Sequence, residues 1–261
     1  MRHGIAWHQE ENIAIITIDN PPANVLNPIL ASQLLKCLKD IEKEDSIRAV
    51  LLCSLDKKFF MAGSDVSEFP TYLKSKAGYI SAGARMMNSV FSYLEDFPLP
   101  VIAAVQGIAL GAGFELVLCC DLCITDKSAQ FGFPEVNLGL MPGSGGTQRL
   151  PRRVGRLKAK ELMFFGCSIS AEEALELGLV NMIVPEGRVF EEAKKLAEKI
   201  SRQPSISIRL IKESINRGSE LPIEQGLKIE SDLFERAFRT EDCKEGLTSY
   251  FQKRKPVFKH E

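Results

Sequence analysis

Two glutamates in the most apolar and glycine-rich part of the chain have the right type and setting for proton transfer. Glu115 follows the glycines of Gly107–Gly113, and Glu135 stands behind Phe133 and Pro134. Burial disfavours the charged form of a carboxyl group and moves its pKa toward neutrality, where the group can both accept and donate a proton. Composition alone leaves open that each glutamate is a solvated or structural carboxylate.

Two turns near these glutamates could supply backbone hydrogen-bond donors. Ala112 lies just before the short apolar helix predicted to carry Glu115, and Ser64 follows Ala62-Gly63 at a similar turn. The first N–H groups of a helix have no acceptor inside it, so they can stabilise a developing oxyanion without any side chain. Two such groups at one carbonyl oxygen would form an oxyanion hole, but separation along the sequence does not place them together.

The residues present do not form the motifs of a catalytic triad, a nucleotide-binding loop or a metal site. The only histidines, His3, His8 and His260, lie near the ends of the chain, so no histidine-dependent triad is indicated. No G-x-G-x-x-G or P-loop pattern occurs, and the flanks of Ser144 do not match G-x-S-x-G. Cys120–Cys123 matches C-x-x-C but has no second Cys or His pair nearby, so it predicts packed core thiols and no metal site.

The elements that must position these residues alternate between strand and helix. The run around Val101–Val105 predicts a buried strand ahead of the glycines, and Tyr72–Gly83 is polar and predicted to be mobile. Further strands are predicted over Ile5–Glu10, Asn12–Asp19 and Arg48–Ser54, and helices over Pro28–Glu44 and Ala84–Phe97. This order predicts an α/β protein whose helices cover the faces of a sheet.

Beyond Leu150 the pattern becomes helical. Ser170 and Glu173 have the spacing of a capping box, which predicts the start of a helix. The other predicted elements are a strand over Val180–Val184 and helices over Gly155–Phe165, Val189–Arg202, Ser207–Arg217, Ile223–Phe238 and Glu241–Gln252. No linker separates this tail from the rest, so we expect a lid or subunit interface and not an independent domain.

Composition narrows the class of protein. The chain has 261 residues, with 33 basic and 34 acidic side chains, which argues against a general nucleic-acid or membrane-surface binder. No apolar run reaches the roughly 20 residues that span a bilayer, and we see no signal or transit segment. An odd number of scattered cysteines favours a reducing compartment. We therefore expect a cytoplasmic protein, or a mitochondrial-matrix protein if a transit segment has been removed.

Five segments carry a resemblance to a known family. They are Pro21–Leu26, Phe60–Asp65, Pro100–Leu116, Phe131–Leu150 and Lys253–Phe258. The second reads F-M-A-G-S-D, and the fourth contains F-P-E-V-N-L-G-L-M-P-G-S-G-G-T-Q-R-L. Over nearly the whole chain these segments resemble the enoyl-CoA hydratase/isomerase (crotonase) superfamily, and most of all an enoyl-CoA hydratase.

The resemblance implies both a fold and a partner. The fold would be α/β, with a crotonase-like spiral of ββα repeats over residues 1–195 and a C-terminal helical trimerisation region over residues 196–261. Homotrimers commonly pair as a dimer of trimers in this family. The substrate would be an acyl-CoA thioester, with no metal or redox cofactor, no nucleic acid and no membrane span.

The resemblance also implies roles for individual residues. By position, Ser64 and Ala112 would supply the oxyanion hole, and Glu115 and Glu135 would be the catalytic acids. Contacts with the substrate or its CoA are implied for Lys58, Ala62, Asp65, Gly111, Gly143, Tyr250 and Lys253, of which Tyr250 and Lys253 would reach the CoA of a neighbouring subunit. Solvated charges at the two lysines, and interface packing at Tyr250, remain open alternatives.

The presence of both glutamates favours hydration of a 2-enoyl-CoA to a 3-hydroxyacyl-CoA, since the position of Glu115 is often apolar in simple double-bond isomerases of the family. Alternatives of the same fold are a Δ3-Δ2-enoyl-CoA isomerase and a specialised dehydratase or decarboxylase. A non-catalytic CoA- or RNA-binding member is a further alternative. The chain departs from the common pattern at three positions, with Ala112 for glycine, Ser64 for alanine and Ser67 for lysine.

Overall fold

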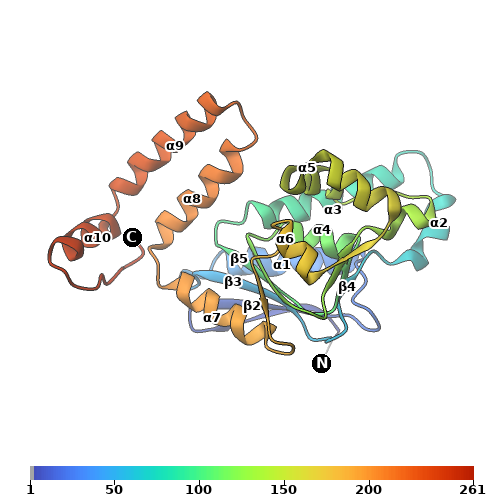
Figure 1. Ribbon diagram of the computed structural model, residues 1–261, viewed down its shortest axis with the longest axis horizontal. Coiled ribbons are helices and arrows are strands. Elements are labelled where there is room, and N and C mark those ends of the chain that lie inside the picture. The colour runs from blue at the N-terminus through green and yellow to red at the C-terminus, as the bar shows by residue number, and fades with distance from the viewer. Residues whose placement is uncertain (1–2) are drawn as a thin grey trace.

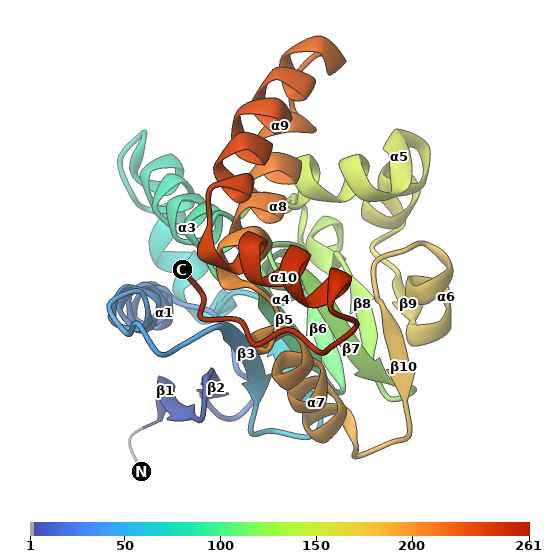
Figure 2. The same ribbon diagram turned by 90° about the vertical axis from the view of Figure 1, so that its left-hand side faces the viewer.

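A twisted sheet of mainly parallel strands forms the base of the molecule. The computed structural model describes residues 3–261, and over them the larger sheet has six strands in the order β1-β2-β3-β5-β7-β10 (Figures 1 and 2). Their bounds are β1 Gly4–Glu10, β2 Ile13–Asp19, β3 Ala49–Ser54, β5 Val101–Val105, β7 Leu122–Asp126 and β10 Met182–Val184. Only β1 runs antiparallel to its neighbour, so the predicted strands and the α/β class are confirmed.

The chain leaves this sheet three times in the same way. After β3, β5 and β7 it enters a second sheet through β4 (Phe59–Ala62), β6 (Ile108–Leu110) and β8 (Gln130–Gly132), and a helical segment follows each of these strands. The second sheet has the order β4-β6-β8-β9 within the described residues, and β9 (Ser168–Ser170) closes it in antiparallel pairing. This repetition confirms the predicted spiral of ββα turns.

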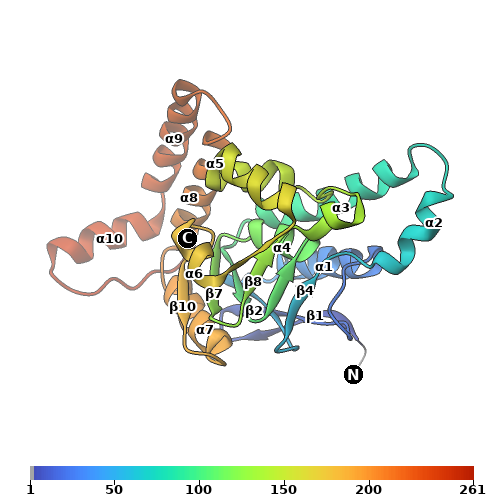
Figure 3. The ribbon, with the colours of Figure 1, turned by 45° about the vertical axis from the view of Figure 1, so that its right-hand side comes forward.

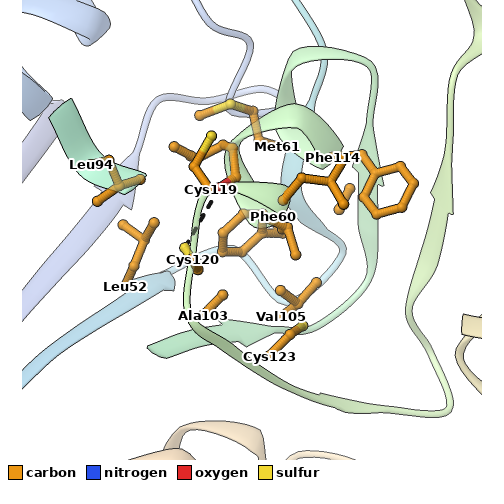
Figure 4. Packing of buried hydrophobic residues seen from close by; sticks show 14 of the residues in the cluster. Leu52, Phe60, Met61, Leu94, Ala103, Val105, Phe114, Cys119, Cys120 and Cys123 are labelled. Atoms are coloured by element: carbon orange, nitrogen blue, oxygen red, sulfur yellow. Dashed lines mark hydrogen bonds between the residues drawn. The ribbon is translucent and has the colours of Figure 1, made fainter. Parts of the chain in front are cut away.

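The core lies between the two sheets. Leu52 of β3 and Val105 of β5 face Phe60 of β4 and Phe114 of α4 (Ala112–Leu118), and all four are fully buried (Figure 4). Full burial of each such side chain stabilises the fold by about 1.5–3 kcal/mol. The two thiols of the C-x-x-C pattern, those of Cys120 and Cys123, lie buried in the same core and form no disulfide, so their predicted packing role is confirmed.

One glycine sets how close α4 comes to β4. A Cβ built on Gly113 would lie 2.1 Å from the carbonyl oxygen of Met61, so any larger residue would push the helix off the strand. The absence of a side chain at Gly113 therefore brings the first turn of α4, with Ala112, against the end of β4.

Helices cover both faces of the larger sheet, and the region before α3 differs from the prediction. The main covering helices are α1 (Pro28–Ile41) and α3 (Tyr79–Glu95) on one side and α7 (Val189–Ser201) on the other. The segment predicted to be mobile, Tyr72–Gly83, instead contains the end of α2 (Phe69–Leu73) and the first turn of α3, which begins five residues before the predicted Ala84. Contacts of the Tyr72 ring with Phe69 and Tyr79 explain this order, which polar composition had masked.

The helix predicted to begin at Gly155 also begins earlier. α5 runs from Gly146 to Phe165 and bends at Gly155, where φ is 80° and ψ is 160°. The sequence obscured its first part because that part starts in a glycine run and contains Pro151, which normally disfavours a helix interior. α6 (Ala171–Glu176) begins with the predicted capping box of Ser170 and Glu173.

Three helices form an arm that extends from the sheets. They are α8 (Ser205–Gly218), α9 (Ile223–Phe238) and α10 (Glu241–Phe251), and the last residues of the chain return along α10 (Figures 1–3). The predicted division at residue 195 falls inside α7, whose Ala193 and Ala197 pack on the larger sheet, so the change in architecture comes after α7. Across residues 3–261 every helix falls short of the length or hydrophobicity needed to cross a bilayer.

Candidate active site

Two parallel strands of the smaller sheet bring Ser64 and Ala112 side by side. The register of β4 and β6 pairs Ala62 with Leu110, so two residues further along Ser64 and Ala112 stand at the same edge. The backbones also approach closely there, since a Cβ on Gly111 would lie 3.6 Å from the Cα of Gly63. The convergence that sequence separation could not establish therefore follows from strand register.

The N–H groups of these two residues are available as donors. Leu26 bonds to the residues on either side of Ser64, accepting from Asp65 N at 2.8 Å and donating to Gly63 O at 2.7 Å. In this parallel pairing the N–H of Ser64 points away from Leu26, and Ala112 is the first residue of α4, where no helical acceptor precedes it. Neither amide donates to a protein group among residues 3–261.

Glu115 is held by backbone donors from a distant loop. Its side chain is buried, and Oε1 accepts hydrogen bonds from Ser144 N at 2.8 Å and Gly146 N at 2.7 Å. Burial raises the pKa of the Glu115 carboxyl, while these two N–H groups and the positive charge of Arg149 oppose that rise by favouring the ionised form. The lack of a side chain at Gly146 is required, because a Cβ there would lie 3.0 Å from the same Oε1.

Glu135 lies against the turn that begins α4. It belongs to the short 3₁₀ helix η2 (Pro134–Leu138), and its Oε1 would be 2.6 Å from a Cβ on Gly111. Its Oε2 is buried and has no hydrogen-bond partner among residues 3–261. Burial raises the pKa of Glu135 to about 7, and the nearby charge of Glu115 adds to the rise. Glu135 is thus poised to hold or release a proton near neutrality.

Three phenylalanines form a rigid apolar wall behind the glutamates. The ring of Phe114 lies 5.3 Å from that of Phe131 and 5.0 Å from that of Phe133, centroid to centroid, and all three are buried. Phe133 also touches the position of Gly146, where a Cβ would be 2.7 Å from its ring. This wall removes water from one side of the site and fixes the backbone on which Glu135 is mounted.

Sequence reasoning missed the loop that holds Glu115. Ser144 was considered only as a nucleophile, and its contribution is its backbone N–H. The signal was present in the run Gly143-Ser144-Gly145-Gly146 immediately before a helix, since small residues at a helix N-terminus expose amide donors that attract an anion. That signal was obscured because the start of α5 was itself missed.

The residues expected to contact the substrate fall into two groups. Ala62, Gly111 and Gly143 lie around the paired turns and the Glu115 loop, with Gly143 O accepting from Asn88 Nδ2 at 3.2 Å. Asp65 also lies there, but its Oδ1 is used to cap the 3₁₀ helix η1 (Val66–Glu68) by accepting from Ser67 N at 3.0 Å.

The other group lies away from the glutamates. Lys58 stands at the opposite end of β4 from Ser64, in a recess it shares with Gly107 and Gln130, and its Nζ is 5.2 Å from the ring centroid of Phe59. Tyr250, which is 77 % exposed, is on α10, and Lys253 follows that helix. Figure 1 shows α10 at the far end of the arm from α4, the helix that carries Glu115.

Comparison with known proteins agrees with this geometry. The family model described as enoyl-CoA hydratase/isomerase matches residues 8–261. The chain is 40 % identical to the short-chain-enoyl-CoA hydratase of Clostridium acetobutylicum, over 97 % of this chain and 96 % of that protein. It is 37 % identical to the crotonyl-CoA hydratase of Syntrophomonas wolfei, over 97 % of both chains.

Solved structures agree as well. The crystal structure of an enoyl-CoA hydratase from Bacillus anthracis superimposes with a TM-score of 0.92 at 38 % identity, covering 99 % of this chain and all of that one. With a full-length family match, relatives well above 30 % identity and the same fold, the chain belongs to the enoyl-CoA hydratase/isomerase family.

Proposed function

We propose that the protein adds water across the double bond of a 2-enoyl-CoA thioester to give a 3-hydroxyacyl-CoA. One observation carries the proposal. Two glutamates flank the paired backbone N–H groups of Ser64 and Ala112 in a largely buried site. Glu115 accepts two backbone hydrogen bonds, whereas Glu135 Oε2 has no partner among residues 3–261. Hydration needs an activated water, a proton for the α-carbon and a place for negative charge on the thioester oxygen, and these groups supply all three.

The N–H groups of Ser64 and Ala112 receive the thioester oxygen. Charge builds up on this oxygen as the double bond is attacked, and two fixed donors stabilise that charge more than they stabilise the neutral substrate. The polarisation also makes the β-carbon electrophilic. The methyl group of Ala112 and the hydroxyl group of Ser64 leave their N–H groups unchanged, so the departures from the common family residues do not weaken this step.

The two glutamates divide the proton transfers. Glu115, fixed by Ser144 N and Gly146 N, which favour its ionised form, orients a water and takes one of its protons as the oxygen bonds to the β-carbon. Glu135, protonated in its buried position, gives its proton to the α-carbon as the C=C π bond breaks. The proton lost by Glu135 is replaced by the one gained at Glu115 through solvent, so the glutamates return to their starting states and no metal or redox cofactor enters the balance.

The direct test is loss of the ultraviolet absorbance of crotonyl-CoA as its conjugated double bond is hydrated. We expect turnover by the purified protein, and a drop of at least about a hundredfold in kcat for Glu135→Gln and for Glu115→Gln. Glu44→Gln, a change at an exposed glutamate in the connection between α1 and β3, is the matched control. Unchanged crotonyl-CoA absorbance together with conversion of 3-enoyl-CoA would assign the protein to the isomerases instead. A series of enoyl-CoAs of different length and branching would define the acyl group.

The arm supports a further part of the proposal, a homotrimer that can pair into a dimer of trimers. Large apolar side chains are exposed along it, which a subunit interface would cover. They include Ile211, Ile215, Ile223, Leu227, Phe234, Phe238, Leu247 and Phe251. In such an assembly Tyr250 and Lys253 would contact the CoA of a neighbouring subunit. Light scattering coupled to gel filtration measures the assembly, and a monomer would contradict it.

We also propose a cytoplasmic location. Seven cysteines without a disulfide among the described residues support a reducing compartment. Fractionation of the source cells, with the protein detected by antibody, tests this location.

A further inference from the structure

The loop Gly143–Gly146 is fixed from behind by a single arginine. We propose that Arg149 is a positioning residue for the reaction, holding this loop so that its amides stay bonded to the Glu115 carboxyl group and aim it at the attacking water. The inference rests on the proposed function of Glu115 and adds a residue that does not touch the substrate. It is carried by three hydrogen bonds of the guanidinium group and by what each of them fixes.

Arg149 bridges the loop and helix α3. Its Nη1 donates to the carbonyl oxygen of Ser144 at 3.2 Å, Nε donates to Glu95 Oε2 at 2.9 Å, and Nη2 donates to Ser92 Oγ at 3.1 Å. Asn88, one turn earlier on α3, donates from Nδ2 to Gly143 O at 3.2 Å. The loop is therefore tied to α3 through two successive carbonyl oxygens, while its N–H groups on the other side bind Glu115.

The planar group of an arginine is needed for this bridge. Three of its nitrogens point to three different acceptors, an arrangement that a lysine ammonium on a flexible stem cannot reproduce. The Arg149 side chain is 11 % exposed and the Glu95 side chain 37 %, so the arginine end of this ion pair is shielded while its glutamate end meets solvent. Such a pair holds its geometry better than a surface pair does.

Position and charge act on Glu115 in the same direction. Holding Ser144 keeps its N–H on Glu115 Oε1, and the guanidinium charge itself favours the ionised carboxylate. The other titratable groups that face Glu115 are Glu135 from η2 and the thiol of Cys119 directly after α4, and neither supplies positive charge. Removing Arg149 therefore leaves Glu115 with fewer groups that stabilise its ionised form.

The test compares Arg149→Met, which removes charge and donors, with Arg149→Lys, which keeps the charge alone. Arg153→Met is the matched control, because Arg153 lies one turn further along α5 and donates to the carbonyl oxygens of Leu118 and Cys120 at the far end of α4. All are measured as assembled full-length protein, by the pH dependence of kcat/KM for crotonyl-CoA and by thermal unfolding.

For Arg149→Met we expect kcat to fall about tenfold to a hundredfold with little change in KM, and the acidic limb of the profile to move up by about one pH unit. Arg149→Lys should bring the acidic limb of the pH profile most of the way back to its wild-type position but should restore little of kcat. Arg153→Met should lower the unfolding temperature and leave the profile in place. A profile for Arg149→Met that matches wild type, or a shift equal to that of Arg153→Met, would overturn the proposal.

A second readout does not depend on activity. The amide resonances of Ser144 and Gly146 report the ionisation of Glu115, since both N–H groups donate to its carboxylate. Their pH midpoint should rise in Arg149→Met and stay unchanged in Arg153→Met. If wild type fails to hydrate any enoyl-CoA, the proposed function fails, while this midpoint still decides the role of Arg149.

Discussion

The carboxylate of Glu135 occupies the space that a side chain at Gly111 would need. A Cβ built on Gly111 lies 2.6 Å from Glu135 Oε1, and the backbone there has φ 49° and ψ −121°, which L-residues rarely adopt. The same glycine thus permits the turn that presents Ala112 N–H and leaves room for the acid beside it. Oxyanion donor and proton donor are placed together by one missing side chain.

Gly111→Ala should consequently impair both groups at once. We expect a loss of about a hundredfold in kcat, since displacement of a catalytic group by about 1 Å has that effect, and destabilisation of about 1–3 kcal/mol from backbone strain. Activity on crotonyl-CoA and chemical denaturation measure the two effects. Gly178→Ala is the matched control, because its φ of 69° is also left-handed but nothing lies within 4 Å of its Cβ. Equal kcat values for the two variants would show that Glu135 is not displaced.

Ala112→Pro should remove an oxyanion donor while leaving α4 intact. Ala112 is the first residue of α4, a position where proline fits and where the lost N–H has no helical acceptor. Removing one such donor typically lowers kcat by 10²–10³-fold, and we expect a loss of that order with a retained circular dichroism spectrum. The corresponding change at the start of α10, Glu241→Pro, should leave kcat unchanged. Full activity of Ala112→Pro would exclude its N–H from the reaction.

The residues changed in these variants also show which parts of the site can be predicted from the sequence. The two glutamates proposed to transfer protons, Glu115 and Glu135, were identifiable from their apolar and glycine-rich surroundings and from the family motifs. Their relationship to Ser64 was not, because it depends on the register of β4 against β6, and no local pattern specifies register between strands nearly fifty residues apart. The spiral topology was expected only through the family resemblance.

Other features lay beyond local pattern for physical reasons. The role of Ser144 depends on a backbone N–H, which every non-proline residue carries, so the serine itself held no signal and only the glycines around it did. The early start of α3 at Tyr79 is stabilised by tertiary contacts of Tyr72, which override polar composition. Lys58 was placed near the substrate by motif position alone, and its position at the opposite end of β4 from Ser64 became visible only in three dimensions.

The stability of the protein should fall with rising pH near neutrality because of Glu135. Its native pKa of about 7 exceeds the value near 4.5 that applies when it is unfolded, so the native state binds the proton more tightly. The stability associated with this proton is fully present below about pH 4.5 and is lost as pH rises through 7. Glu135→Gln keeps a neutral side chain throughout. Between pH 5 and 8 its free energy of unfolding should therefore fall by about 1–2 kcal/mol less than that of wild type, a figure reduced because Glu135 is partly exposed.

Denaturant titrations at several pH values measure this difference. Glu44→Gln serves again as the control, since it makes the same change of side chain at an exposed position. Parallel stability curves for wild type and Glu135→Gln between pH 5 and 8 would contradict a raised pKa at Glu135.

The arm should be held to the core by one largely buried ion pair. Lys212 Nζ on α8 lies 2.7 Å from Asp121 Oδ2, with side-chain exposures of 10 % and 24 %, and the same Oδ2 accepts from Val101 N at 2.7 Å. Asp121 follows α4, so the pair links the arm to the helix that carries Glu115. Burial raises the pKa of Asp121 and the Lys212 charge opposes that rise.

Lys212→Met should leave an uncompensated carboxylate and destabilise the protein by about 2–3 kcal/mol at pH 7. Loss of the Lys212 charge raises the pKa of Asp121 further. The destabilisation should therefore become smaller as pH falls toward 4 and the Asp121 carboxyl takes up a proton. Adding Asp121→Asn should recover part of the stability, and a double-mutant cycle in denaturant measures the coupling. Lys36→Met, at an exposed lysine of α1, controls for loss of a charge. Additive effects of the two substitutions would show that the pair does not hold the arm.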